Sequence, residues 1–129
     1  MKPQPLIAVR DVEASSRWYQ AVLGLKSGHG GPDYEQLTWR GRMVMQLHRW
    51  EAHAHSHIGS PLKPHGNGVL VWFQTDHFET LLQRVRRQGA RVLEGPQVNR
   101  NANHREIWLQ DPDGYVVVVA GPYGDIGLR

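Results

Sequence analysis

The chain of 129 residues is 40% hydrophobic and contains five tryptophans, enough material for one domain with its own core. The absence of cysteine excludes disulfide bonds and thiolate chemistry. The formal net charge is +3, but the one basic cluster, Arg84, Arg86 and Arg87, falls on the polar face of a predicted helix, so nucleic acid is not expected as a partner. The longest aliphatic run, Val116–Ala120, is far shorter than the roughly 20 residues that cross a membrane, and the polar, proline-rich start is not typical of a secretory signal. We therefore expect a cytoplasmic protein without a membrane partner.

A strand followed by a helix is predicted at the start of the chain. The short apolar segment Leu6–Val9 is typical of a buried strand. Asp11 is suited to cap the helix that follows, Val12–Leu23, in which apolar side chains recur at helical spacing on one face. Gly24 is suited to end this helix in the left-handed conformation.

The second half of the chain repeats this pattern. Apolar residues 69–73 predict another strand, and Asp76 and Gly89 would begin and end another amphipathic helix. Asp76 lies 65 residues after Asp11, and Gly89 lies 65 residues after Gly24. Matching start and stop signals at one offset indicate an internal duplication.

Each predicted helix is followed by further strand-like segments. They cover residues 36–39 and 43–48 in the first half, and residues 91–94, 105–110 and 115–120 in the second. Arg40-Gly41-Arg42 joins the first pair and Asp111-Pro112-Asp113-Gly114 joins the last, and both are hairpin signals. The asparagine-rich residues 99–103 are expected to form a turn.

These elements predict an α+β fold made of two tandem βαβββ halves in a single domain. The first half covers about residues 4–50 and the second about 68–120, with a His-, Pro- and Gly-rich connecting loop at 51–67 and an irregular tail at 121–129. Each helix must bury its apolar face on the outside of its own sheet, which leaves the opposite sheet face for a ligand. Two such sheets would form a cupped, mixed sheet around one small-molecule site.

Two segments carry a resemblance to a known family. The first runs from Val9-Arg10-Asp11-Val12-Glu13-Ala14-Ser15 into Trp18-Tyr19 and Leu23-Gly24-Leu25, and the second is Trp108-Leu109-Gln110-Asp111-Pro112-Asp113-Gly114-Tyr115. In this order and at this separation they resemble the vicinal-oxygen-chelate superfamily, which includes glyoxalase I, extradiol dioxygenases, fosfomycin-resistance enzymes and bleomycin-resistance proteins. The resemblance extends over about residues 4–124 and implies the paired βαβββ fold and a homodimer, which would also cover exposed sheet edges.

The resemblance also places the metal-binding positions of this family. Its enzymes hold one divalent metal with His, Gln or Glu at four equivalent positions, which fall here on Gln4, Gln46, Asn67 or Gly68, and Val118. Val118 has no donor atom and Gly68 has no side chain, and two amides bind divalent metals poorly. The resemblance thus implies a member without the usual metal site, like the bleomycin-resistance branch, which binds its drug in a groove shared by two subunits. Glyoxalase I and extradiol dioxygenase activities are disfavoured, and no cofactor is expected.

A relocated catalytic or metal site is the alternative. If Gln46 faces the cup, strand alternation turns His48 the same way, and the family pattern does the same for Trp108, Glu106 and His104. His48, His104 and Glu106 would then form an acid–base cluster, or would bind one divalent metal such as Zn or Fe. The same three residues also suit a role as hydrogen-bonding residues of a pocket or sheet, without catalysis.

Other residues are candidates for ligand contact. Trp39, Trp72 and Trp108 lie on predicted strands, where tryptophan serves either as core or as a wall for flat ligands. Gln4 and Gln46 would add hydrogen bonds. Arg105 is suited to pair with a ligand carboxylate or phosphate, although a surface arginine needs no such role.

A histidine-rich run lies in the connecting loop. His53, His55 and His57 alternate, and His65 follows near the end of the loop. Such tracts bind Zn, Cu or Ni in some proteins, and this loop could also close over the cup as a lid. An exposed loop with histidines explains the same residues without either function.

Three functions are compatible with these features. The first is a small-molecule binding protein that binds or sequesters an aromatic or drug-like ligand. The second is a lyase, isomerase or dioxygenase-type enzyme that uses the relocated His48, His104 and Glu106 site. The third is a structural or regulatory module that uses the sheet edges and leaves the inward histidines unexplained. Whether the protein turns over a substrate stays open at this point.

Overall fold

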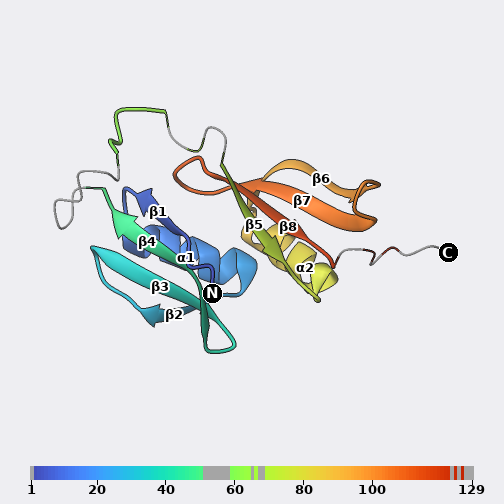
Figure 1. Ribbon diagram of the computed structural model, residues 1–129, viewed down its shortest axis with the longest axis horizontal. Helices are drawn as coiled ribbons and strands as arrows, with labels where there is room; N and C mark the ends of the chain where they lie inside the picture. The colour runs from blue at the N-terminus through green and yellow to red at the C-terminus, as the bar shows by residue number, and fades with distance from the viewer. Residues whose placement is uncertain are drawn as a thin grey trace. The chain divides into compact units, whose positions relative to one another are not determined.

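The computed structural model describes residues 2–50, 59–64, 66, 69–122, 124 and 126. The chain divides into two compact units, Met1–His65 and Gly66–Arg129 (Figure 1). Among the described residues, the first unit contains β1 (Leu6–Val9), α1 (Val12–Leu23), β2 (Lys26–His29), β3 (Tyr34–Trp39) and β4 (Arg42–Arg49). The second contains β5 (Leu70–Gln74), α2 (Phe78–Gln88), β6 (Arg91–Asn99), β7 (His104–Gln110) and β8 (Val116–Ala120).

The two units share one topology. Each contains a four-stranded sheet, in the order β1-β4-β3-β2 in the first unit and β5-β8-β7-β6 in the second. Strand β1 runs parallel to β4, and β5 runs parallel to β8, while the remaining neighbours in each sheet are antiparallel. The predicted α+β fold of tandem βαβββ modules with mixed sheets is therefore confirmed, and the repeated strand order agrees with the inferred duplication.

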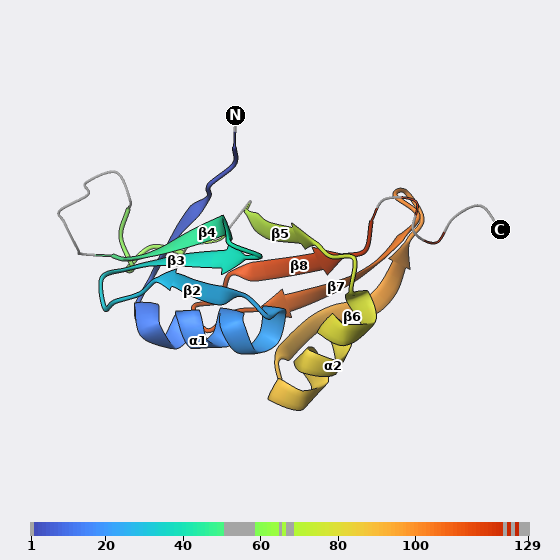
Figure 2. The same cartoon turned by 90° about the horizontal axis from the view of Figure 1, so that it is seen from below.

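Helix α1 begins and ends where the sequence predicts. The Asp11 carboxylate accepts a hydrogen bond from the Ala14 backbone N–H at 2.9 Å, and Gly24 ends the helix with φ of 76°. The Ser16 hydroxyl donates to the buried Glu35 carboxylate on β3 at 2.7 Å, so Glu35 lies on the face of the sheet that α1 covers. Figure 2 shows α1 along that face. Strand alternation then places Tyr34 on the opposite face.

Helix α2 corrects one prediction. Asp76 is not its N-cap: the helix begins at Phe78, and its N-cap is His77, which forms no capping hydrogen bond through its side chain. The reason is Thr75, the residue before Asp76. Its hydroxyl accepts a hydrogen bond from the His77 backbone N–H at 3.0 Å, and the helix therefore starts one residue later than predicted. The predicted stop is confirmed, since Gly89 ends α2 in the left-handed region.

Helix α2 packs alongside the second sheet. Its buried residues are Phe78, Leu81, Leu82 and Val85, and the buried aliphatic residues of the strands include Ile107, Leu109, Val117 and Val119. The Arg105 guanidinium lies 4.8 Å from the centre of the Phe78 ring and pairs with Glu79, so odd-numbered positions of β7 face α2. None of the helices in the described ranges is long and apolar enough to cross a membrane.

Two strands differ from the sequence prediction by more than one or two residues at an end. The first is β2, which we did not predict because all four of its residues are exposed and carry no apolar alternation. The second is β6, which continues to Asn99 instead of ending at Glu94. Its pairing with β7 shifts register on both sides of Glu94, and such irregularities break the two-residue period on which strand prediction depends.

The Asp111–Gly114 hairpin forms as predicted. The Asp111 carboxylate accepts hydrogen bonds from the backbone N–H groups of Asp113 and Tyr115 at 2.9 and 2.8 Å, and Gly114 has φ of 95°. This turn aligns β7 with β8 so that Trp108 pairs with Val118. The asparagine-rich turn is also present, with the Asn101 backbone N–H donating to the Asn99 side chain at 3.0 Å.

Candidate functional site

The face of the second sheet that points away from α2 carries aromatic, apolar and ionisable side chains together. We call it the helix-free face and define it by Leu70, Trp72, His104, Glu106, Trp108 and Val118. Trp72, Val118 and Trp108 stand side by side on β5, β8 and β7. Leu70 and Trp72 are 46% and 45% exposed, although Val118 between the tryptophans is buried. Trp108 is half-buried, so the exposed apolar side chains of this face are Leu70 and Trp72, and an exposed aromatic ring beside polar groups is a common feature of ligand sites.

Glu106 is the most tightly held polar group on this face. It is only 3% exposed, and its carboxylate accepts hydrogen bonds from His104 Nε2 at 3.0 Å, from Asn99 Nδ2 at 2.9 Å and from Trp108 Nε1. Burial by itself would raise the pKa of Glu106, but the hydrogen bonds from Trp108, Asn99 and His104, with the charge of His104, hold it below its ordinary value of 4.5. Glu106 is therefore an ionised carboxylate at neutral pH.

The ionised carboxylate orients His104. Because a carboxylate only accepts hydrogen bonds, Nε2 of His104 carries the hydrogen of this pair, and Nδ1 becomes the acceptor nitrogen of the neutral ring. His104 is 7% exposed, and its ring centre lies 6.0 Å from that of Trp72. The buried polar pair thus lies next to the exposed tryptophan.

Arg105 and Trp39 lie elsewhere. Arg105 contacts Phe78 and Glu79 of α2, on the opposite side of the sheet from its neighbours His104 and Glu106. Trp39 belongs to the first unit, at the end of β3, where the Arg40 guanidinium lies 5.6 Å from the centre of its ring. The structure therefore brings Trp72 and Trp108, but not Arg105, to the face that carries the His104–Glu106 pair.

On the first sheet, the face away from α1 carries a chain of amide hydrogen bonds. The Tyr34 hydroxyl donates to Gln46 Oε1 and accepts from Gln36 Nε2 at 3.1 Å, and Gln46 Nε2 donates to the backbone carbonyl oxygen of Gln4 at 2.9 Å. Gln4 and Gln46, two of the positions implied by the family resemblance, are thus adjacent. Both polar atoms of the Gln46 side chain are engaged within the protein.

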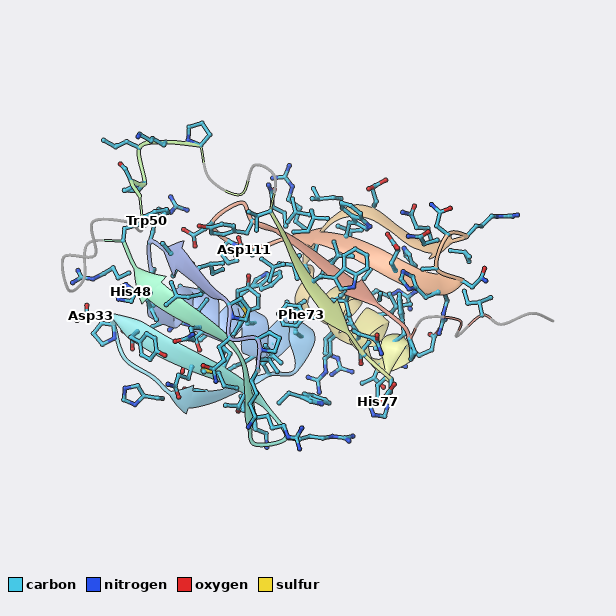
Figure 3. All side chains as sticks on the ribbon, in the orientation of Figure 1. Asp33, His48, Trp50, Phe73, His77 and Asp111 are labelled. Carbon is cyan, nitrogen blue, oxygen red and sulfur yellow. The ribbon has the colours of Figure 1, made fainter. Side chains whose placement is uncertain are left out.

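His48 lies on this same face of the first unit. It lies on β4 (Figure 3) and is buried. Its Nδ1 is 2.7 Å from the Arg49 backbone carbonyl oxygen, and its ring centre is 6.2 Å from that of Tyr34. His104 and Glu106 belong to the second unit. The structure brings His104 and Glu106 together, and their combination with His48 in one catalytic or metal site stays a prediction.

The remaining metal candidates divide between described and undescribed residues. Val118 is buried and has no donor atom. Asn67, Gly68 and the loop histidines His53, His55, His57 and His65 lie outside the described residues. Within the ranges that the structure describes, no three histidine, aspartate or glutamate side chains are grouped so that they could hold a metal ion.

Sequence reasoning missed Asn99 and Tyr34 as site residues. Asn99 pairs with His104 across the β6–β7 hairpin, which brings its amide to Glu106. Tyr34 pairs with His48 across β3 and β4. The asparagine-rich turn was a signal for Asn99, but the cross-strand pairing that gives it a role depends on the register, which the sequence did not show.

These features define a paired βαβββ protein with an aromatic, ionisable sheet face. A family model described as the Glyoxalase/Bleomycin resistance protein/Dioxygenase superfamily matches residues 3–119, and the chain belongs to this superfamily. The resemblance inferred from the sequence motifs is thereby confirmed.

Several solved structures share the fold. A protein of unknown function from Agrobacterium tumefaciens has a TM-score of 0.75 at 17% identity, with 94% of each chain covered. A glyoxalase/bleomycin resistance protein/dioxygenase family enzyme from Burkholderia phytofirmans has a TM-score of 0.73 at 22% identity, covering 92% of this chain and 95% of that one. TioX from Micromonospora has a TM-score of 0.70 at 15% identity, covering 95% and 98%. A comparison with curated proteins finds no match.

Proposed function

We propose that the protein binds a small aromatic or drug-like molecule on the helix-free face of the second sheet. The observation that carries this proposal is the exposed Trp72, which contacts His104 and stands in line with Trp108. Tryptophan offers a large flat surface at small entropic cost, and a few polar groups beside it give orientation. Glu106 and His104 supply those groups.

The proposed binding needs no metal at the positions that the family uses for one. Gln46 already donates and accepts hydrogen bonds within the protein, and Val118 offers no donor. Gln4, Gln46 and Trp39, which the sequence also predicts to bind ligand, belong to the first unit. The effect of an alanine substitution at each position on ligand affinity tests these predictions. Such ligand binding is the first of the three functions with which the sequence features are compatible.

Binding is tested by thermal shift and tryptophan fluorescence with a panel of aromatic and glycosylated compounds. Trp72→Ala is expected to weaken the binding of any hit by on the order of tenfold or more, because a central aromatic contact contributes well over 1 kcal/mol. Leu62→Ala is the control, since Leu62 is apolar and 93% exposed but lies in the 59–64 segment, outside the helices and strands. A panel without hits, or a Trp72→Ala protein that binds as tightly as the parent, contradicts the proposal.

Acid–base catalysis is the second candidate function, and the His104–Glu106 pair favours it. A histidine that is held by a buried, ionised carboxylate is the usual arrangement of a general base, because the carboxylate stabilises the imidazolium that forms. Such a pair would serve a lyase, an isomerase or a dioxygenase-type enzyme. In the predicted enzyme, His48 would join His104 and Glu106 as a third catalytic residue, or the three side chains would bind one divalent metal.

We also expect a cytoplasmic homodimer. Strands β5 and β6 are the edges of the second sheet, and exposed sheet edges are commonly covered by a partner. Light scattering at micromolar concentration is expected to give twice the mass of one chain. A mass of one chain would contradict the dimer.

A further inference from the structure

We propose that His104 accepts the proton of an acidic hydroxyl on the bound ligand, so that the site selects phenols and enols over ligands of the same shape without that proton. The inference rests on the binding function proposed above and assigns the chemical class of its ligand. It follows from the hydrogen bonds around Glu106, which engage Nε2 of His104 and leave Nδ1 as its acceptor nitrogen.

The hydrogen-bonding capacity of Glu106 is directed at the protein. Three side-chain donors, from Asn99, His104 and Trp108, converge on its carboxylate, which is buried. A carboxylate with three donors and a lowered pKa is a poor proton acceptor. Glu106 therefore fixes and polarises His104 and does not take up the ligand proton itself.

His104 is left with one nitrogen for a ligand. Nε2 is bound to Glu106 at 3.0 Å, so the acceptor of the neutral ring is Nδ1. When a phenol donates to it, the O–H bond breaks with its electron pair staying on oxygen, and an N–H bond forms at Nδ1. The imidazolium then lies between two anions, the phenolate and Glu106, and the total charge of the three groups is unchanged.

The surroundings of His104 contain little competing charge. Among the described residues, its neighbours on the same sheet are neutral: Asn99, its pair on β6, Ala120 of β8, which pairs with Glu106, and Trp72 on β5. Arg105 faces α2, and Arg100 is exposed in the turn. Glu106 is the one ionisable side chain bonded to His104 in this part of the chain, so a positive charge on the ring is stabilised by a single defined partner.

The indole ring of Trp72 lies beside the imidazole ring of His104. Its centre is 6.0 Å from that of His104, with the two planes tilted by 51°. In the proposed complex, a flat ring packs on the exposed Trp72, and a hydroxyl on its edge donates to Nδ1 of His104. An aromatic ring with a hydroxyl substituent satisfies both halves of the site.

Two probes that differ by one proton donor test the inference. Para-nitrophenol absorbs visible light as the phenolate but not as the phenol, and para-nitroanisole has the same ring with a methyl ether in place of the hydroxyl. The wild-type protein is expected to bind para-nitrophenol on the order of tenfold more tightly, since a hydrogen bond that involves charged groups is stronger than one between neutral groups. Binding is also expected to raise phenolate absorbance at a pH at which the free probe is mainly phenol.

The matched variant is His104→Gln, whose amide N–H can still donate to Glu106 but which cannot take up a proton. It is expected to lose both the tenfold preference and the absorbance change while still binding para-nitroanisole. His77→Gln, an exposed histidine before α2 in the same unit, is expected to behave as the wild type. Thermal unfolding establishes that each variant is folded, and the comparison of the two probes on the wild-type protein stands even if His104→Gln does not fold.

The outcomes separate the two proposals. Equal binding of both probes by the wild-type protein, without an absorbance change, would overturn the role of His104 and leave the aromatic binding function standing. Binding of neither probe would overturn this inference, whereas the aromatic binding function is contradicted only by a compound panel without hits or by unchanged binding to Trp72→Ala. An absorbance change that persists in His104→Gln would assign the proton to another group and would also overturn the inference.

Discussion

Replacing Glu106 by alanine is expected to lower the free energy of unfolding by about 3 kcal/mol, because a buried charged partner is removed and its donors remain. The substitution leaves the Trp108 indole N–H, the Asn99 amide and His104 Nε2 without their shared acceptor. Each of these groups must then find water or stay unsatisfied. The loss is greater than for an exposed carboxylate, whose removal changes little.

Urea denaturation measures this effect, with Glu94→Ala on the neighbouring strand β6 as the exposed control, for which a change below about 0.5 kcal/mol is expected. The pH dependence gives a second readout. The pKa of Glu106 is lowered in the folded protein, so its negative charge stabilises the fold at every pH above the ordinary pKa of 4.5. This contribution to stability is lost as the pH falls through the pKa of the folded state. The stability difference between wild type and Glu106→Gln should shrink with acidification. Equal stabilities of Glu106→Ala and Glu94→Ala would contradict the hydrogen-bond arrangement.

Replacing Gly95 by alanine is expected to destabilise the protein by about 3 kcal/mol, through backbone conformation and steric conflict together. Gly95 has φ of 85°, which disfavours any side chain. A Cβ at this position would also lie 2.8 Å from the Glu106 carbonyl oxygen and 3.0 Å from the Gln97 backbone nitrogen. Both contacts are with backbone atoms, which cannot rotate away, so β6 must separate from β7 beside the candidate site.

Gly41→Ala is the matched control for this substitution. Gly41 has nearly the same φ, 78°, in the β3–β4 hairpin, but a Cβ there would meet no atom within 4 Å beyond its chain neighbours. The control therefore measures the conformational effect alone, about 1–2 kcal/mol. Urea denaturation should show Gly95→Ala to be less stable than Gly41→Ala by about 1–2 kcal/mol, since overpacking adds to the conformational effect, and ligand affinity should fall only for Gly95→Ala. Similar losses for both variants would mean that β6 accommodates the methyl group.

Local signals in the sequence were sufficient for most of the fold. Asp11 and Gly24 mark the ends of α1 because capping and left-handed termination depend on neighbouring residues only. The same reasoning failed at Asp76, where a competing local hydrogen bond to Thr75 moved the start of α2. Strand β2 was missed because an exposed strand has no apolar pattern and forms only when β3 lies beside it.

Strand alternation was enough to predict that His104 and Glu106 share a face with Trp108, since side chains two residues apart on a strand point the same way. Sequence by itself thus determined the duplicated βαβββ fold and the central pair of the candidate site. Only the tertiary structure decided that Asn99 completes the hydrogen bonds of Glu106, that Trp72 lies against His104 and that Arg105 binds to α2. These contacts join residues on different elements, and the register of the hairpins and the packing of the helix set them, which no short stretch of sequence encodes.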